Sequence, residues 1–400
     1  MHRVLPSDTI CYVFSVLIPI LLLASGCEPE RPPSLADTGE NAYYAPDQPG
    51  PFTAGVLMME IMDPRGKEMT VEVWYPAIVG EGATPDDYGE IALSLNGYRD
   101  AIPAQAAGPF PLVAFSHGFA GIRYQSAFLT EHLATHGMVV VAPDHRYNTF
   151  LDLNEDHVVD VLLERPDDIR YAVDAVLARS ESDDFFLGDM VDITDGYAVV
   201  GHSFGSYTSM VIAGGVLDPG YAETHCQEQG SPICRYLDQF APELLEGHGT
   251  SDERAVVSVP ISPGLWYLFG EGGAGLSSVR SPLVLGGDKD QVLSYDREGL
   301  PSYQAMPLPR TLATYIDGGH YAPFSNSCDF AAPLFDDCTG VEGGWIDIAP
   351  AQAATLILVT AYLKDQLIGD RRYTSSWMVD ALPGHPEVIL EHAMPPDPAP

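Results

Sequence analysis

A short stretch from Tyr197 to Gly205 constrains the fold of this 400-residue chain more than any other. Its apolar first part, Tyr197–Val200, is typical of a buried β-strand, and the sequence GHSFG follows directly at 201–205. Glycines two residues before and two after a serine allow a sharp turn, because no Cβ stands in the way. The small and apolar residues of Ser209–Val216 continue as a helix. The pattern predicts a nucleophile elbow that presents Ser203; the alternative is a glycine-rich turn that contains a serine by chance.

Strand-like and helix-like segments alternate through most of the chain. Two runs at 55–61 and 68–75 flank a turn sequence and predict a β-hairpin. Pro166 is expected in the first turn of its helix. Alternation of strands and helices predicts an α/β fold, with a mostly parallel central sheet, helices on both faces and the hairpin at its N-terminus. The other predicted strands are 112–116, 138–142, 197–200, 255–261, 282–285 and 311–316, and the helices are 124–136, 166–179 and 350–367.

Three candidate catalytic residues follow predicted strands in the order Ser203, Asp290, His320. The carboxyl ends of parallel strands meet at one edge of a sheet, so these residues can come together there. Serine is a poor nucleophile unless a base takes its proton. His320 would be that base and then the acid that protonates the leaving alcohol, and Asp290 would hold the imidazole. Asp288 and Asp317 remain alternatives for the acid.

A tetrahedral intermediate also needs two N–H donors for its oxyanion. We expect the amide of Phe204, which follows the serine, and the amide of Phe119, in the loop after the first parallel strand. In the same loop, His117 is either a substrate contact or a structural histidine. His132 and His136 lie four residues apart on a predicted helix, but no H-E-x-x-H motif accompanies them, and surface histidines are the preferred interpretation.

Four of the six cysteines form two close pairs, Cys226 with Cys234 and Cys328 with Cys338. Disulfides are favoured in exported chains, and pairing within each close pair is the simplest arrangement. A zinc site is the alternative, but the spacings lack a C-x-x-C pattern. We therefore predict two disulfides, no metal and no cofactor.

The N-terminus is typical of a targeting segment, with Arg3 ahead of the apolar run Ile10–Ala24. The run ends in the sequence LASGC at 23–27, which resembles a bacterial lipobox with Cys27 as the lipidated residue. The alternative is ordinary signal-peptide cleavage, with Cys27 incidental. We predict a lipid-anchored protein of the bacterial cell envelope, on its extracytoplasmic side.

Composition shifts divide the chain into four parts. We predict a lipoprotein signal peptide at 1–26, a flexible tether at 27–51, a catalytic domain at 52–370 and a C-terminal tail at 371–400. The polar segment 217–254, which contains the first cysteine pair, is predicted to be a lid-like insertion.

The charge of the chain excludes some partners. The formal net charge is −37, from 56 acidic and 19 basic residues. Nucleic acids require clustered Lys and Arg, and an anionic lipid surface would repel such a chain. We expect a small-molecule or lipid ester as the partner, membrane contact through the N-terminal anchor alone, and a monomer.

Four blocks of sequence carry a family resemblance. They are FSHGFAGIRYQSAFLTEHLATHGMVVVAPDHRY at Phe115–Tyr147, GHSFGS at Gly201–Ser206, VWYP at Val73–Pro76 and GGH at Gly318–His320. Together they resemble plasma-type platelet-activating-factor acetylhydrolases and their bacterial relatives, the dienelactone-hydrolase-like or cutinase-like esterases. The resemblance covers about residues 55–370. It implies an α/β-hydrolase fold, metal-free ester hydrolysis, a nucleophile at Ser203, a base at His320, and oxyanion amides at Phe119 and Phe204.

The chain departs from the animal phospholipases of this family at one strand. There the acid follows the strand after the elbow helix, whereas here that strand ends in the sequence VPISP at 259–263, without an aspartate. The acid is therefore expected from the later turn at Asp290, as in dienelactone-hydrolase-like enzymes. Dienelactone hydrolases themselves use a cysteine where this chain has Ser203.

The sequence thus predicts an exported, lipid-anchored serine esterase that works through an acyl-enzyme. One alternative is a lipase, a phospholipase A2-like enzyme or a polyester hydrolase. Such an enzyme would need a wide apolar groove, for which Phe119, Trp266, Tyr267 and Phe269 are candidates. The other alternative is a surface binding protein on an inactive hydrolase scaffold.

Overall fold

The computed structural model describes residues 43–80, 83–86, 88, 96–229, 231, 233–237 and 250–396. The chain divides into two units, Met1–Pro32 and Pro33–Pro400, and every described residue belongs to the second. The predicted signal peptide, Cys27 and the first part of the predicted tether therefore lie outside the described residues, as does part of the predicted insertion.

The described residues form one sheet of eleven strands, with bounds β1 Thr53–Met62, β2 Glu68–Ile78, β3 Gly97–Arg99, β4 Ile102–Pro103, β5 Leu112–Ser116, β6 Val139–Pro143, β7 Tyr197–His202, β8 Ala255–Ile261, β9 Leu283–Gly287, β10 Arg310–Tyr315 and β11 Val388–Ala393. The strand order is β11-β10-β9-β8-β7-β5-β6-β2-β1-β3, and β4 pairs with β2. The six central strands from β6 to β10 run parallel to one another. β1 and β2 form the predicted antiparallel hairpin.

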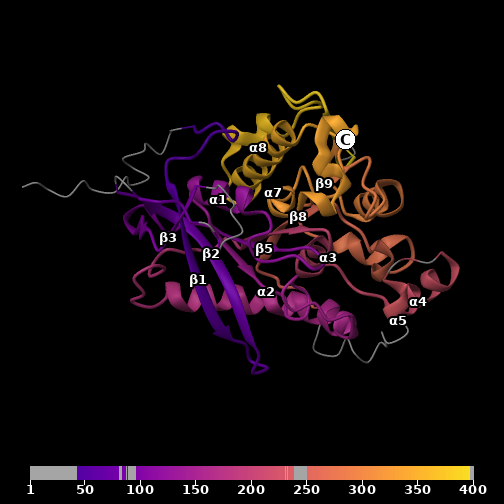
Figure 1. Cartoon of the computed structure of the whole chain (residues 1–400), viewed down its shortest axis with the longest axis horizontal. Coiled ribbons are helices and arrows are strands. Elements are labelled where there is room, and N and C mark those ends of the chain that lie inside the picture. Colours follow the sequence, from indigo (N-terminus) through magenta and orange to yellow (C-terminus); the bar gives the residue numbers. More distant parts are fainter. Residues whose placement is uncertain are drawn as a thin grey trace, which may run out of the picture. The chain divides into compact units, whose positions relative to one another are not determined.

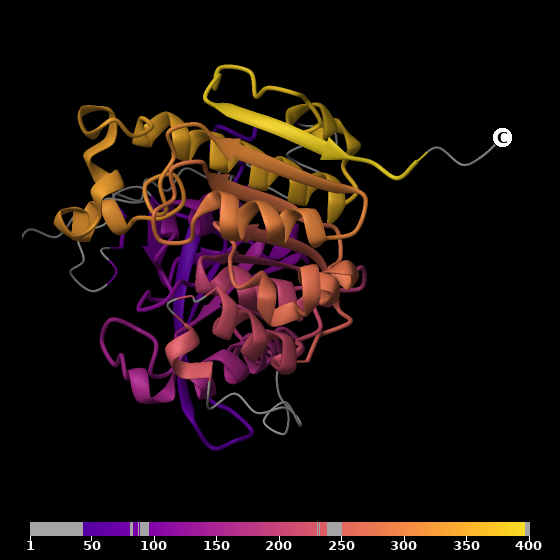
Figure 2. The same cartoon turned by 90° about the vertical axis from the view of Figure 1, so that its right-hand side faces the viewer.

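Helices cover both faces of this sheet (Figures 1 and 2). Helices α1 (Ala127–Thr135) and α8 (Ile348–Gln366) pack on one face, and α2 (Val158–Ser180) packs on the other. Successive residues of β5 point to opposite faces, so Val113 joins the cluster of α1 and α8 while Leu112 joins that of α2. Helix α3 (Phe204–Ile212) packs against the first turns of α2. This arrangement confirms the predicted α/β architecture.

Helix α2 differs from the prediction because it begins at Val158, so that Pro166 lies inside the helix and not in its first turn. A proline within a helix removes the hydrogen bond to the carbonyl four residues earlier. That carbonyl belongs to Leu162, and the buried Tyr207 hydroxyl donates to it at 3.0 Å. A residue of α3 thus satisfies the group that the proline leaves free.

Both ends of the catalytic domain extend beyond the predicted boundaries. β11 pairs antiparallel with β10, so residues predicted to form a loose tail add the last strand to the sheet. At the other end, His132 and His136 hydrogen-bond the carbonyls of Pro46 and Gln48, each at 2.8 Å. Both histidines are buried. The prediction that they lie on the surface is therefore wrong, because the second part of the predicted tether covers them.

Both predicted disulfides are present. Cys226 of α4 (Pro219–Glu228) is bonded to Cys234 of α5 (Cys234–Leu237), within the predicted insertion. Cys328 is bonded to Cys338 in the segment before α8. Among the described residues no single helix is long and apolar enough to cross a bilayer, although the bent pair Asp336–Gly343 and Ile348–Gln366 has the necessary length and composition.

Candidate active site

Ser203 lies on a sharp turn between β7 and α3. Its backbone has φ 57° and ψ −119°, a strained conformation for a residue with a side chain. Close contacts with the backbone leave no room for a side chain at either flanking glycine. A Cβ on Gly201 would lie 2.0 Å from the carbonyl oxygen of Gly205, and one on Gly205 would lie 1.9 Å from that of Ser116. The backbone geometry is that of a nucleophile elbow, which the GHSFG sequence predicted.

Asp290 and His320 come together at the ends of β9 and β10. The Nδ1 atom of His320 lies 2.6 Å from Oδ2 of Asp290, and both side chains are buried. An ionised carboxylate only accepts hydrogen bonds, so Nδ1 is the donor, and in the neutral imidazole Nε2 then carries the lone pair. Among the described residues, Nε2 of His320 is a buried atom without a hydrogen-bond partner. It is therefore available as a base.

The two alternative acids point elsewhere. Asp288 is exposed, and its Oδ1 accepts from the amide of Asp317 at 2.7 Å. Asp317 is also exposed and forms an ion pair with Lys289 at 2.7 Å. Of the three candidate aspartates, the structure brings Asp290 to His320.

His202 joins the serine turn to the histidine loop, a role that the sequence analysis missed. Its Nε2 donates to the carbonyl oxygen of His320 at 2.7 Å, and its Nδ1 accepts from the side-chain amide of Gln125 at 2.7 Å. Burial lowers the pKa of His202 to about 3, so the ring is neutral and this tautomer is fixed by its two partners. The variable position of G-x-S-x-G gives no signal for such a contact.

The loop that carries Phe119 lies against the serine. A Cβ on Gly118 would be 3.3 Å from Cβ of Ser203. Among the described residues, neither the Phe119 amide nor the Phe204 amide donates to a protein acceptor. His117, left open by the sequence, is a fully buried structural residue. Its Nδ1 donates to the carbonyl of Gly118 at 2.7 Å.

A mostly apolar cavity of about 230 Å³ opens beside Ser203. Part of its wall comes from the predicted insertion, at the first turn of α5. Of the four aromatic residues predicted to line an apolar groove, only Phe119 lines this cavity. Tyr267 and Phe269 are buried in the cluster around α3. The lining residues are Phe119, Val158, Ser203, Phe204, Ser231, Ile233, Arg235, Tyr236, Leu265, Val292 and Leu293.

A second cavity, of about 250 Å³, opens beside His320, and Val292 lines both cavities. Its wall includes Tyr321 and Trp345 and the carboxylate of Asp336. Ser203 and His320 therefore line different cavities, and these two cavities have one lining residue in common.

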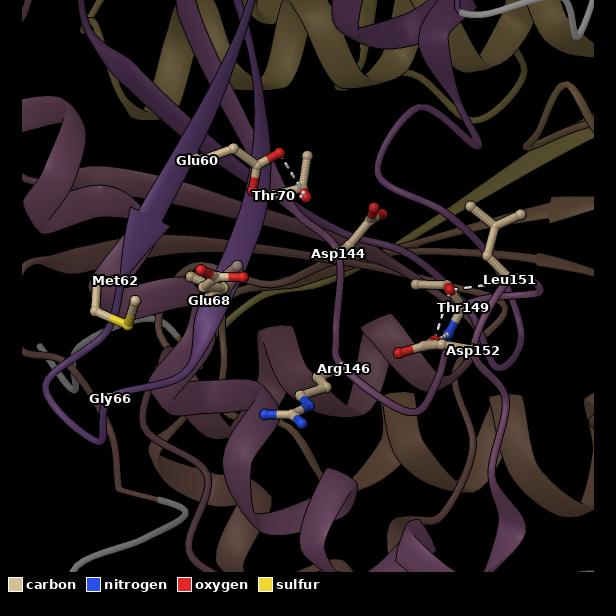
Figure 3. Close-up of a pocket in the computed structure, with 11 residues that line it drawn as sticks. Glu60, Met62, Gly66, Glu68, Thr70, Asp144, Arg146, Thr149, Leu151 and Asp152 are labelled. Atoms are coloured by element: carbon tan, nitrogen blue, oxygen red, sulfur yellow. Dashed lines mark hydrogen bonds between the residues drawn. The ribbon is translucent and has the colours of Figure 1, made fainter.

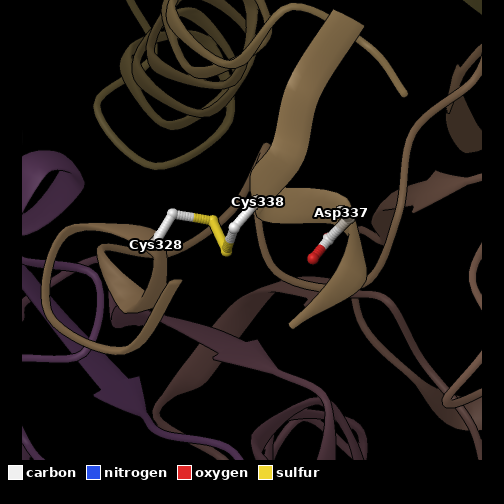
Figure 4. Close-up of side chains that lie close together, drawn as sticks. All are labelled: Cys328, Asp337 and Cys338. Carbon is white, nitrogen blue, oxygen red and sulfur yellow. A yellow bond between two sulfur atoms is a disulfide. The ribbon is translucent and has the colours of Figure 1, made fainter. Parts of the chain in front are cut away.

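The histidine loop is held by the segment that contains the second disulfide. The buried carboxylate of Asp337 accepts from the amides of Tyr321 and Ala322 at 2.7 and 2.9 Å. Figure 4 shows Asp337 next to Cys338 and its bond to Cys328. These three residues have the spacing of a metal cluster, but both sulfur atoms belong to the disulfide and the carboxylate is engaged by amides. The contacts assign this group to loop anchoring.

A larger cavity, of about 600 Å³, lies between the β1–β2 hairpin and the loop after β6 (Figure 3). Some of its charged side chains are hydrogen-bonded to neighbours, for example Glu60 to the hydroxyl of Thr70 and Asp152 to that of Thr149. No candidate catalytic residue lines it. The candidate catalytic residues Ser203 and His320 line the two smaller cavities instead.

Comparison with known proteins agrees with this geometry. The family model of "Platelet-activating factor acetylhydrolase, isoform II" matches residues 79–151, which include β5, the Phe119 loop, α1 and β6. No curated protein matches the chain. Among solved structures, a ferulic acid esterase from Streptomyces cinnamoneus is similar with a TM-score of 0.56 and 18% identity, over 85% of this chain and 96% of that one. The predicted α/β-hydrolase fold and the predicted resemblance are confirmed, and the matches support a carboxylic ester hydrolase.

Proposed function

We propose that this chain is an exported, lipid-anchored serine esterase that uses Ser203 as nucleophile, His320 as base and Asp290 as the orienting acid. The observation that carries the proposal is the Asp290–His320 hydrogen bond, since it leaves Nε2 of His320 free for the serine proton. The strained elbow at Ser203 supports it.

The proposed reaction has two halves. Oγ of Ser203 attacks the ester carbonyl while Nε2 of His320 takes its proton, and the Phe119 and Phe204 amides stabilise the oxyanion. His320 then returns the proton to the leaving alcohol, which departs and leaves an acyl group on Ser203. Water, deprotonated by His320, hydrolyses this acyl-enzyme and restores the serine.

A fluorophosphonate probe tests the proposal on the intact chain. Attack by an activated serine on phosphorus displaces fluoride and leaves a stable adduct, so folded protein should be labelled and peptide mapping should place the label on Ser203. Protein that has been heat-denatured first is the control. A folded chain that resists the probe and hydrolyses no ester in a panel of alkyl, aryl and thioester substrates would instead support a binding protein.

The two cavities suggest how an ester would lie. The leaving oxygen must be within reach of Nε2 of His320, so the alcohol belongs in the cavity beside His320. The acyl group then occupies the apolar cavity beside Ser203, whose volume of about 230 Å³ suits a short or medium acyl chain, or a single aromatic ring. Its small volume favours an esterase over a hydrolase of long or insoluble substrates.

Replacement of Ile233 by tryptophan should narrow the acyl cavity. We expect the kcat/KM of Ile233→Trp for p-nitrophenyl hexanoate to fall by about 10-fold relative to that for p-nitrophenyl acetate, because a longer chain loses contacts that the short one never makes. Val216→Trp is the matched control, since Val216 is exposed and does not line the cavity. Equal losses on both esters would contradict the assignment of this cavity to the acyl group.

Lipid anchoring at Cys27 rests on the LASGC sequence at 23–27. The full-length chain expressed in a bacterium should enter the membrane fraction and the detergent phase of a Triton X-114 separation, whereas Cys27→Ser should not. Cys11→Ser, which changes the other cysteine of the leader, should behave like the wild type. A mature N-terminal peptide without a lipid mass on Cys27 would rule out the anchor.

A further inference from the structure

The fully buried Arg165 of α2 lies behind the proposed oxyanion amides. Its Nη2 donates to the carbonyl oxygen of His117, in the segment that leads to Phe119, and to Oγ of Ser116 at 3.0 Å. Its Nε donates to Oγ1 of Thr208 at 3.0 Å, on α3. One guanidinium therefore ties together the two segments that carry the proposed oxyanion donors.

The contacts on the α3 side reach Phe204 itself. The hydroxyl of Thr208 accepts from Arg165 and also lies 3.3 Å from the carbonyl oxygen of Phe204, to which it donates. Cζ of Arg165 lies 4.6 Å from the centre of the Phe204 ring, within the range of a cation–π contact. The planar, rigid fork of arginine is suited to hold several acceptors at once.

The charge of Arg165 is not neutralised by its direct partners. The four acceptors are a carbonyl, two hydroxyls and the side-chain oxygen of Asn148. The carboxylate of Asp168 is connected to Arg165 only through two other side chains. Ser116 contacts His145 at 2.9 Å, and His145 contacts Asp168 at 3.0 Å. Burial lowers the pKa of Arg165 to about 9, so it keeps its proton at neutral pH. A buried cation acts strongly on negative charge that develops nearby.

We propose that Arg165 is a positioning residue for the oxyanion hole, which fixes the Phe119 and Phe204 amides in relation to each other and places a positive charge behind them. The inference rests on the proposed function. A role of this kind stabilises the transition state and leaves ground-state binding almost unchanged, so it should appear in kcat and not in KM.

The test replaces Arg165 by methionine, which removes the charge and the fork, in the full chain. Kinetic constants are expressed per active site, counted by fluorophosphonate labelling, so that misfolded protein does not contribute. We expect kcat of Arg165→Met to fall by about 100-fold with KM within about 3-fold of the wild type. A trifluoromethyl ketone, which forms an oxyanion-bearing adduct with the serine, should lose affinity by the same factor as kcat/KM.

Arg280→Met is the matched control. Arg280 also binds backbone carbonyls, those of Ala255, Asp252 and Ile212, but at the opposite ends of β8 and α3. It should lower the melting temperature without changing kcat per labelled site. Arg165→Lys keeps the charge without the fork and should recover part of the lost kcat.

If Arg165→Met does not fold, Thr208→Val removes a single anchor of the guanidinium and should lower kcat several-fold, again in parallel with the affinity for the ketone. An active variant with unchanged kcat overturns this inference alone. A wild-type chain that neither takes up the probe nor hydrolyses esters overturns the proposed function as well.

Discussion

Ser203→Ala is expected to lower kcat for p-nitrophenyl acetate by at least about 10⁴-fold, because the proposed acyl-enzyme can no longer form. The binding cavities and the oxyanion amides do not depend on Oγ, so KM should change little and a small residual rate over water should remain. The measurement is steady-state hydrolysis by the full chain, with fluorophosphonate labelling on the same preparations.

Ser209→Ala provides the matched control for this result. Ser209 is a buried serine of α3, and its hydroxyl donates to the carbonyl of Ser206 at 2.8 Å, within the helix. Its replacement should leave kcat within about 2-fold and labelling intact, because its oxygen reaches neither cavity. Turnover by purified Ser203→Ala at the wild-type rate would assign hydrolysis to another residue or to a contaminating enzyme.

The parts of this site that the sequence predicted are those where backbone sterics leave few choices. Gly201 and Gly205 allow the elbow because a Cβ at either position would overlap a backbone carbonyl. Gly318 and Gly319 likewise pack closely, against Tyr315 and Asp337, and His320 follows them directly. Such constraints are local, so a short pattern of glycines is enough to identify the turn and the side chain that it presents.

The parts that sequence analysis missed depend on contacts between distant segments. Pro166 is normally a sign of a helix start, but Tyr207 of α3 supplies the hydrogen bond that lets the helix continue. β11 joins the sheet by pairing with β10, which lies more than 70 residues earlier in the chain, and no local pattern predicts this pairing. The sequence offers no signal for Arg165 either, since its four acceptors come from the end of β5, from the loops after β5 and β6, and from α3.

The choice of the acid among three aspartates could be predicted only in part from the sequence. The turn after β9 contains both Asp288 and Asp290, and sequence spacing favoured Asp290 without excluding its neighbour. The direction of each carboxylate depends on the amides around it. Oδ1 of Asp290 accepts from the amides of Val292 and Leu293, both at 2.8 Å, and this orients Oδ2 toward His320.

Asp290→Asn should therefore lower kcat by about 10⁴-fold while folding is preserved. The amides of Val292 and Leu293 need an acceptor, so they hold Oδ1 of the new asparagine and turn its NH₂ group toward Nδ1 of His320. Two donors cannot face each other, and His320 is forced into the tautomer with its proton on Nε2. In that form it cannot take the proton of Ser203, and steady-state kinetics with circular dichroism measures the loss.

Asp288→Asn is the control from the same turn. Its Oδ1 accepts from the amide of Asp317, a contact that asparagine can keep, and it does not touch His320. We expect kcat of Asp288→Asn within about 3-fold of the wild type, since the His320 tautomer is unaffected. A large loss in Asp288→Asn together with an active Asp290→Asn would transfer the role of the acid to Asp288, and would mean that the turn after β9 rearranges when substrate binds.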